Sequence, residues 1–404
     1  MGKQRSILLL GGSKQQVVAI ETAKRLGYRT VLCDYLPDNP GQFSADVFYQ
    51  ESTTDREKML EIARREQVDG VLAYSSDPAA PTAAYVAEKL GLPTNPLKAV
   101  ETLSVKHLFR EHLHKSGLPC PLSCAVPVDA TPAELIDRAQ NMSLPVVLKP
   151  TDSSGSKGVS VIRVLDEVDF ARALSHAAEF SRNCILVLEE YIEATFPRVV
   201  GGDVFVVDGR VRFWGIMSCL RDESLGGLVP VGERNPSGLS PAQMAKVRNV
   251  IQELVSSLGI RFGELNVEII IGSGDTPFFL ELGARAGGNM IPVQLSDISG
   301  IDLVEANVRC AIGDYSMDVD FEGAPDVVCT YVLHAPKSGI FRALSIPLQV
   351  AEHVYRKVMY LGEGDPVDGF DSASKAIGIL FLRFDDEEQM NVSLESLREC
   401  VVVE

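Results

Sequence analysis

Short apolar runs alternate with longer amphipathic stretches through the first part of the chain. Three runs have the length and composition of buried strands, namely Ser6–Leu10, Thr30–Cys33 and Gly70–Tyr74. Stretches with helical periodicity follow them, at Gln15–Leu26, Thr54–Glu66 and Pro81–Leu90. Strands and helices that alternate over short connections predict a parallel, doubly wound sheet. We therefore expect a Rossmann-like N-terminal domain over residues 1–95.

The pattern changes after Thr94-Asn95-Pro96, which has the composition of a linker. A helix is predicted from about Ala99 to Ser116, and a second long helix over Pro241–Leu258. Between them, an Asp-Gly pair at residues 208–209 predicts a β-hairpin. After Gly313 the pattern becomes rich in short strands. The expected fold class is therefore α/β, with a central domain over residues 96–315 and a small β-rich domain over residues 316–404.

Composition narrows the function classes. The chain has 404 residues, which is too long for one ordinary domain, and its net charge of −17 disfavours nucleic acid and anionic membranes as partners. The apolar run Ile7–Leu10 is too short for a signal peptide or a membrane span. Eight cysteines occur without the spacing of a zinc site. Reduced thiols in a cytoplasmic protein are the plain interpretation.

A lysine followed by a loop of small residues is the first candidate for chemistry. Lys149 ends an apolar strand that begins at Val146, and the loop Thr151–Gly158 comes next. Small side chains let backbone N–H groups approach phosphate oxygens, and a buried ammonium group favours an anion. The segment is not a P-loop. The alternative is a flexible connection between two strands, without a ligand.

Two glutamates and an arginine form the second candidate. Glu268 and Glu281 lie on two strands joined by Gly272-Ser-Gly-Asp275, at levels that place both carboxylates near one another. Carboxylates that converge repel each other unless a cation bridges them, and Mg²⁺ prefers oxygen ligands. Arg285 follows in a glycine-flanked segment and could hold phosphate or carboxylate oxygens. The alternatives are two solvated glutamates and an ordinary salt-bridged arginine.

Two weaker signals stay open. Gly11-Gly12 with Asp34 resembles a dinucleotide turn, but the later glycines of that motif are absent, so nicotinamide binding is disfavoured. The same turn could hold a substrate carboxylate or phosphate through its backbone N–H groups. The segment Leu188–Ile192 could be a hinge whose backbone binds an adenine.

In this order the motifs resemble those of the ATP-grasp superfamily, and the resemblance covers almost the whole chain. Within it the chain is most similar to carboxylate–amine ligases such as the L-amino-acid ligases, and it also resembles the carbamoyl-phosphate synthetase large subunit. The resemblance implies binding of ATP with Mg²⁺ or Mn²⁺, small-molecule carboxylate and amine substrates, an acyl-phosphate intermediate and a homodimer.

The resemblance also implies a role for each matching position. Arg285 and Lys149 would be catalytic, and Arg285 would steady the transferred phosphate. Glu268 and Glu281 would bind the metal. The remaining positions would bind ATP through its phosphates, the closing loop or the adenine, namely Lys106, Lys149, Ser154, Gly155, Ser156, Lys157, Gly158, Glu189, Glu190 and Ile192.

Two positions depart from the pattern of the superfamily. Gly283 stands where many members have an asparagine near the metal, and Phe196 where many have a ribose-binding glutamate, for which Glu193 and Asp203 are the candidate substitutes. They keep two alternatives open beside the ligase. One is an enzyme that activates bicarbonate, as in carboxylation or carbamoyl phosphate synthesis. The other is a nucleotide-binding regulatory protein without turnover.

Overall fold

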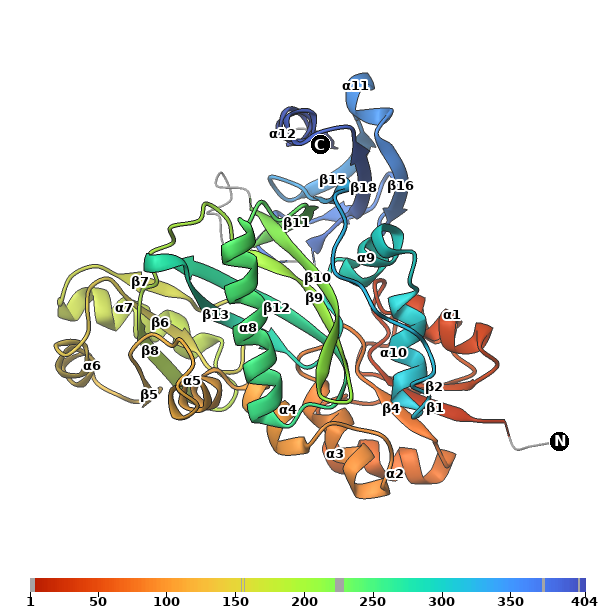
Figure 1. Cartoon of the computed structure of the whole chain (residues 1–404), viewed down its shortest axis with the longest axis horizontal. Coiled ribbons are helices and arrows are strands. Elements are labelled where there is room, and N and C mark those ends of the chain that lie inside the picture. The colour runs from red at the N-terminus through yellow and green to blue at the C-terminus, as the bar shows by residue number, and fades with distance from the viewer. Residues whose placement is uncertain (1–3, 154, 156, 222–228, 373–374, 399) are drawn as a thin grey trace.

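A computed structural model describes residues 4–153, 155, 157–221, 229–372, 375–398 and 400–404 (Figure 1). Its N-terminal sheet has the strand order β3-β2-β1-β4, and every pair is parallel. The strands are β1 (Ser6–Leu10), β2 (Arg29–Asp34), β3 (Val47–Gln50) and β4 (Gly70–Leu72). The helices are α1 (Val17–Arg25), α2 (Arg56–Glu66) and α3 (Ala80–Leu90). The predicted parallel sheet is confirmed.

Helices cover both faces of this sheet, but one of them comes from far along the chain. Side chains of α2 and α3 share a buried cluster with Leu8 and Leu10, on one face. On the other face Ile7 and Leu9 pack with α1 and with α10 (Leu303–Ala311). The N-terminal sheet is therefore completed by a helix that the sequence assigned to the central domain.

A second sheet lies at the left of Figure 1, with the order β5-β8-β6-β7. Its strands are β5 (Ser123–Pro127), β6 (Val146–Pro150), β7 (Ser160–Ile162) and β8 (Ile185–Glu190), and all its pairs are antiparallel. Helices α6 (Pro132–Ala139) and α7 (Glu167–Glu179) bury their apolar sides against it. A capping box at Thr131 starts α6.

The largest sheet has eight strands in the order β13-β12-β9-β10-β11-β14-β18-β16. Its first five strands are β9 (Val200–Val207), β10 (Arg210–Arg221), β11 (Pro230–Asn235), β12 (Phe262–Gly272) and β13 (Thr276–Gly283). Helix α8 (Pro241–Leu258) covers one face, and α9 (Ile291–Ser299) with α10 covers part of the other. The predicted hairpin at Asp208-Gly209 joins β9 to β10.

The C-terminal region continues this sheet and also forms a small three-stranded sheet of its own. Its strands β14 (Val327–Leu333), β16 (Val354–Met359) and β18 (Gly378–Phe384) extend the sheet beyond β11. The remaining elements are β15 (Gly339–Leu344), α11 (Leu348–Ala351), β17 (Pro366–Val367), α12 (Glu387–Ser396) and β19 (Val401–Val403), and the small sheet has the order β17-β15-β19. Of these, α11, α12 and β15 are labelled in the upper part of Figure 1. Residue 316 therefore separates two segments of chain that share one sheet.

The helix predicted over residues 99–116 is wrong as a single element. The chain forms α4 (Leu97–Ser104) and α5 (Lys106–Lys115), and Val105 between them has extended dihedral angles. The backbone N–H of Lys106 donates to the carbonyl of Thr151 at 2.8 Å instead of continuing the first helix. This long-range bond places Lys106 at the start of α5, beside the loop that follows β6. Within the described ranges, no helix is long and apolar enough to cross a membrane.

Candidate active site

A buried ion network connects α5 with the second sheet. The Lys149 Nζ lies 2.5 Å from Glu189 Oε1, and Arg110 Nε donates to Glu189 Oε2 at 2.8 Å. All three side chains are at most 5% exposed. Burial opposes the charge of Glu189, but Arg110 and Lys149 outweigh it and lower its pKa to about 2. Burial lowers the pKa of Lys149.

This network suggests a role for Glu189 that differs from the predicted contact with ATP. Its carboxylate already accepts from two cations, so it orients Lys149 within the protein. Sequence reasoning did not single out Arg110, although it follows Lys106 by four residues and therefore shares a helix face with it. The four-residue spacing from Lys106 was the signal in the sequence that could have pointed to Arg110.

Lys106 joins the loop after β6 to the metal-site candidates. Its Nζ donates to the carbonyl of Ser153 at 2.6 Å and to Glu281 Oε1 at 3.4 Å. Of the loop positions, Gly155 and Lys157 are exposed, whereas Ser154 and Ser156 lie outside the described residues. Gly158 has a φ of +75°, and a Cβ there would lie 2.7 Å from Pro150, so glycine is required.

The hinge segment lies at the end of β8. The backbone N–H of Glu190 donates to Leu122, and that of Tyr191 to Pro145. The Glu190 carboxylate accepts from the backbone N–H of Ser143 at 2.8 Å. Ile192 lies two residues beyond the end of the strand and is partly buried. Adenine contacts at Glu190 and Ile192 stay predictions, and the N–H of Glu190 is already used within the protein.

Glu268 and Glu281 are direct partners in the antiparallel pair β12–β13, as the sequence predicted. Arg221 Nη2 lies 3.6 Å from Glu268 Oε2. Burial raises the pKa of Glu268, with a further rise from Glu281 and an opposing effect of Arg221. Within the described residues, no group of three or more His, Cys, Asp or Glu side chains is arranged to hold a metal ion. Glu268 and Glu281 would therefore be the two carboxylate ligands of a metal ion at this place.

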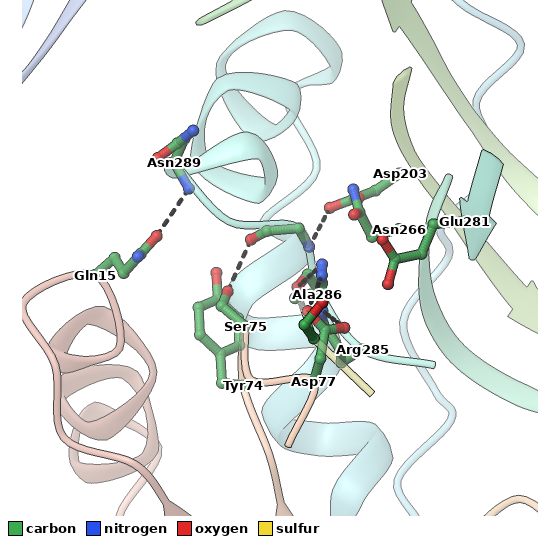
Figure 2. A network of polar contacts seen from close by, with 12 residues as sticks. Gln15, Tyr74, Ser75, Asp77, Asp203, Asn266, Glu281, Arg285, Ala286 and Asn289 are labelled. Carbon is green, nitrogen blue, oxygen red and sulfur yellow. Dashed lines mark hydrogen bonds and ion pairs between the residues drawn. The ribbon is translucent and has the colours of Figure 1, made fainter. Parts of the chain in front are cut away.

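Arg285 forms a two-pronged ion pair with Asp77 of the N-terminal region (Figure 2). Nε and Nη2 each donate to one carboxylate oxygen at 2.7 Å. Burial opposes both charges, yet Arg285 lowers the pKa of Asp77 and Asp77 raises that of Arg285. A Cβ at Gly283 would lie 2.9 Å from Asp77 Oδ1 and 3.1 Å from Arg285 Nε. The ion pair therefore fills the space that a side chain at 283 would need.

The loop after Arg285 is fastened to the N-terminal region at two further points (Figure 2). Ser75 Oγ donates to the carbonyl of Gly287 at 2.7 Å, and the N–H of Asn289 donates to Gln15 Oε1 at 2.7 Å. The structure thus brings together the Ser75–Asp77 turn and the arginine loop. It does not leave the N–H groups of Gly12 and Ser13 free, since they donate to Asp34 and Gln16. The idea of an anion at that turn is therefore wrong for these two donors.

A pair of acids lies beneath this loop, and the sequence reasoning named Asp203, as a substitute ribose ligand, but missed Glu264. Asp203 is fully buried, accepts from Asn266 Nδ2 and from the N–H of Gly287 at 2.8 Å each, and its pKa is raised to about 6 by burial. Glu264 beside it has its pKa raised by burial and by Asp203. It lines a cavity of about 110 Å³ between the N-terminal and central regions. Asp203 is thus enclosed by protein and does not reach a ribose in this arrangement.

Phe196 has a structural part. It is 8% exposed and belongs to the core between α8 and the large sheet. The guanidinium carbon of Arg198 lies 5.1 Å from its ring centroid. Glu193, the other expected substitute for a ribose ligand, is exposed. The unusual stretch around Phe196 therefore packs the start of β9 against the core.

Comparison with known proteins identifies the family. The model of the carbamoyl-phosphate synthase L chain ATP-binding domain matches residues 105–318. The chain belongs to this family. The matched segment includes every predicted nucleotide and metal position, from Lys106 to Arg285. The interpretation of the chain as an ATP-binding, ATP-dependent ligase of the ATP-grasp type is thereby confirmed at the level of the family.

Relatives and solved structures agree with the assignment. The chain is 27% identical, over 69% of each sequence, to a formate-dependent phosphoribosylglycinamide formyltransferase from Aliivibrio fischeri. It is 25% identical to human carnosine synthase 1, over 77% of this chain but only 40% of that protein. An L-amino acid ligase structure from Bacillus licheniformis has a TM-score of 0.82 at 20% identity, with complete coverage of both chains. The α/β ATP-grasp fold is confirmed.

Proposed function

We propose that this protein is a carboxylate–amine ligase. ATP phosphorylates a substrate carboxylate to an acyl phosphate, and an amine then displaces phosphate to form an amide or peptide bond. The observation that carries the proposal is the direct pairing of Glu268 with Glu281, with Lys106 bound to Glu281 and to the loop after β6. Carboxylates and a lysine at one place suit a bound metal–nucleotide complex.

The chemistry of the donors fits Mg²⁺, with Mn²⁺ as a substitute. Both donors are carboxylates, and burial together with Glu281 raises the pKa of Glu268, so a cation there would be stabilised. Mg²⁺ usually keeps several waters and shares the phosphates of its nucleotide, so two protein carboxylates are sufficient. When bound, the ion would neutralise charge that develops on the transferring phosphoryl group.

The cationic side chains have distinct parts in this proposal. Lys149 is held in one orientation by Glu189, and Lys106 lies at the start of α5, where both would bind phosphates. Residues 154–158 would close over the nucleotide and exclude water from the acyl phosphate. Arg285, which Asp77 holds beside Gly283, would steady the transferred phosphate. Glu190 and Ile192 would contact the adenine.

The test is ADP release by the wild type, Glu281→Ala and Arg285→Ala with a panel of amino acids offered as acid and amine. We expect amide formation by the wild type and a loss of at least about tenfold in each variant, since both residues act on the charge of the transition state. Glu322→Gln, on an exposed residue that pairs with Arg248, is the control. Undiminished, substrate-dependent ADP release in both variants would contradict the proposal.

Two further measurements distinguish the ligase from the two alternative functions. ADP release that needs bicarbonate but no amino acid would support a carboxylating or carbamoylating enzyme, and tight ATP binding without turnover would support a regulatory protein. The domain boundaries at residues 95 and 315, the homodimer and the cytoplasmic location stay predictions. Light scattering of the purified protein measures its molar mass in solution and so tests the predicted homodimer.

A further inference from the structure

Glu233 is a buried carboxylate that neither the motifs nor the proposed metal site uses. It lies on β11, opposite Cys219 of β10, and is 4% exposed. Its Oε2 atom is buried and has no hydrogen-bond partner among the residues that the structure describes. Burying a carboxylate oxygen without a partner is costly, so a cation that reaches this oxygen would be stabilised there.

The backbone at this position is held from two sides. The N–H of Glu233 donates to Thr330 Oγ1 at 3.0 Å, and Gln294 Nε2 donates to the Glu233 carbonyl at 3.0 Å. Thr330 and Gln294 are themselves linked at 3.2 Å. Contacts among β11, β14 and α9 therefore fix the backbone of Glu233, and its Oε2 atom is the part left without a partner among the described residues.

The side chain reaches across β10 toward the proposed metal site. A Cβ at Gly201 of β9 would lie 3.0 Å from Glu233 Oε2 and 2.6 Å from Cys219 Sγ, so the carboxylate lies over the bare backbone of Gly201. On the next strand, Asn266 pairs with Asp203 and Ile269 with Val200, which places Glu268 and Gly201 between the same two pairs. A group bound over Gly201 is thus about 4.8 Å, one strand spacing, from the strand that carries Glu268.

The charges on this face favour a cation. Glu281, Glu268 and Glu233 lie on β13, β12 and β11 of one sheet, with β9 and β10 between the last two, and Arg221 pairs with Glu268 at 3.6 Å. Burial raises the pKa of Glu233 to about 8, opposed by a hydrogen bond from Cys219 and assisted by Glu268. A cation that reaches Oε2 relieves both the burial and the repulsion.

We propose that Glu233 binds the ammonium group of the amine substrate and holds it over Gly201, beside the site of acyl phosphate formation. This inference rests on the proposed ligase function and adds the acceptor subsite to it. The ligand class is a primary amine that forms an ammonium–carboxylate pair with Glu233, and its nitrogen gives the shared proton back to Glu233 before it attacks the acyl phosphate. Its placement one strand away from Glu268 would bring the nucleophile next to the activated acid.

The experiment compares a cationic and a neutral nucleophile in the same enzyme. The amine probe is the amino acid that gives the fastest ADP release in the panel above, and the neutral probe is hydroxylamine, which traps acyl phosphates as hydroxamates. In Glu233→Gln, we expect KM for the amine probe to rise at least about tenfold, because a charged hydrogen-bond acceptor is lost. Hydroxamate formation should stay within about twofold of the wild type, since it needs no ammonium site.

Each outcome has one meaning. An unchanged KM for the amine probe overturns the acceptor subsite while the ligase function stands, and equal losses with both probes overturn it in favour of a metal or structural role. Failure of the wild type to form either product contradicts the ligase function itself. Gly201→Ala, whose methyl group would displace the carboxylate, should reproduce the amine-specific defect, and Glu322→Gln is again the control. Should Glu233→Gln not fold, Gly201→Ala carries the same comparison.

Discussion

Two groups of buried carboxylates in this molecule differ in how their charge is compensated. In the first, Glu189 accepts from Lys149 and Arg110 and forms a closed ion network between α5 and the second sheet. In the second, Glu281, Glu268 and Glu233 lie across the large sheet, with Lys106 and Arg221 at 3.4 and 3.6 Å as their cations. The first carboxylate is satisfied by the protein, whereas the second group has three carboxyl groups for two cations.

The difference appears in the direction of the pKa shifts. Ion pairing outweighs burial at Glu189 and lowers its pKa to about 2, whereas burial dominates at Glu233 and raises its pKa to about 8. Compensated carboxylates position other groups, and uncompensated ones remain available to cations that arrive with the substrates. A buried acid therefore indicates a binding site only when its partners have been identified.

The largest expected effect comes from a substitution that breaks the ion network around Glu189. Arg110→Ala removes one of the two cations of Glu189 and leaves a buried charge less compensated, so we expect a loss of about 3–5 kcal/mol in the free energy of unfolding. Urea denaturation measures it. Arg172→Ala, at an exposed pair with Asp169, is the matched control and should cost about 0.5 kcal/mol or less. A loss for Arg110→Ala as small as the control's would show that the network does not carry this charge.

The second prediction is that Glu189 and Glu233 make the stability of the fold depend on pH in opposite directions. Glu189 has a lowered pKa, so its contribution to stability is present above the unfolded pKa of about 4.3 and is lost as pH falls toward about 2. Glu233 has a raised pKa, so the folded state holds its proton and stability falls as pH rises from about 4.3 to about 8. Glu233→Gln should remove a slope of roughly 1.4 kcal/mol per pH unit in that window.

Unfolding free energies at pH 5, 6, 7 and 8 measure the difference between wild type and Glu233→Gln. Glu322→Gln, at an exposed glutamate, should leave the slope unchanged. Parallel curves for the wild type and Glu233→Gln would mean that Glu233 is charged in the folded protein, and the contrast with Glu189 would then disappear.

The smallest expected effect concerns the ion pair between Arg285 and Asp77, which lies next to Gly283. Gly283→Ala would place a methyl group 2.9 Å from Asp77 Oδ1 and 3.1 Å from Arg285 Nε, and we expect a cost of about 1–3 kcal/mol from overpacking. Thermal unfolding measures it. Gly274→Ala is unsuitable as a control because its φ is +67°. Gly288→Ala, where a Cβ would lie 3.7 Å from its nearest neighbour, is the matched control.

Much of the site could be predicted because its signals are local. Lys149 with its glycine loop, and Glu268 with Glu281 around a glycine turn, are patterns within one strand or one hairpin, where spacing along the chain determines spacing in the fold. The structure confirms the direct pairing of the two glutamates. The order of these segments along the chain was sufficient to indicate the superfamily that the family match confirms.

The missed features depend on contacts between distant segments. Arg110 becomes important because α5 lies against β8, and Asp77 because it reaches Arg285, 208 residues later. Glu233 is exceptional because Gly201 and Cys219 form its surroundings. No periodicity within one element reports such a contact, since the free energy of a buried charge depends on which groups surround it.

The sequence alone therefore determined the α/β architecture and the parallel N-terminal sheet. It also supplied the candidate lysine, glutamate and arginine positions, whose roles stay predictions. Tertiary structure alone decided that the helix near residue 105 ends, because Lys106 N–H bonds to Thr151. It also decided which carboxylates are satisfied. Local preferences and spacing act within a segment, whereas burial and charge compensation are set by segments that meet only in the folded chain.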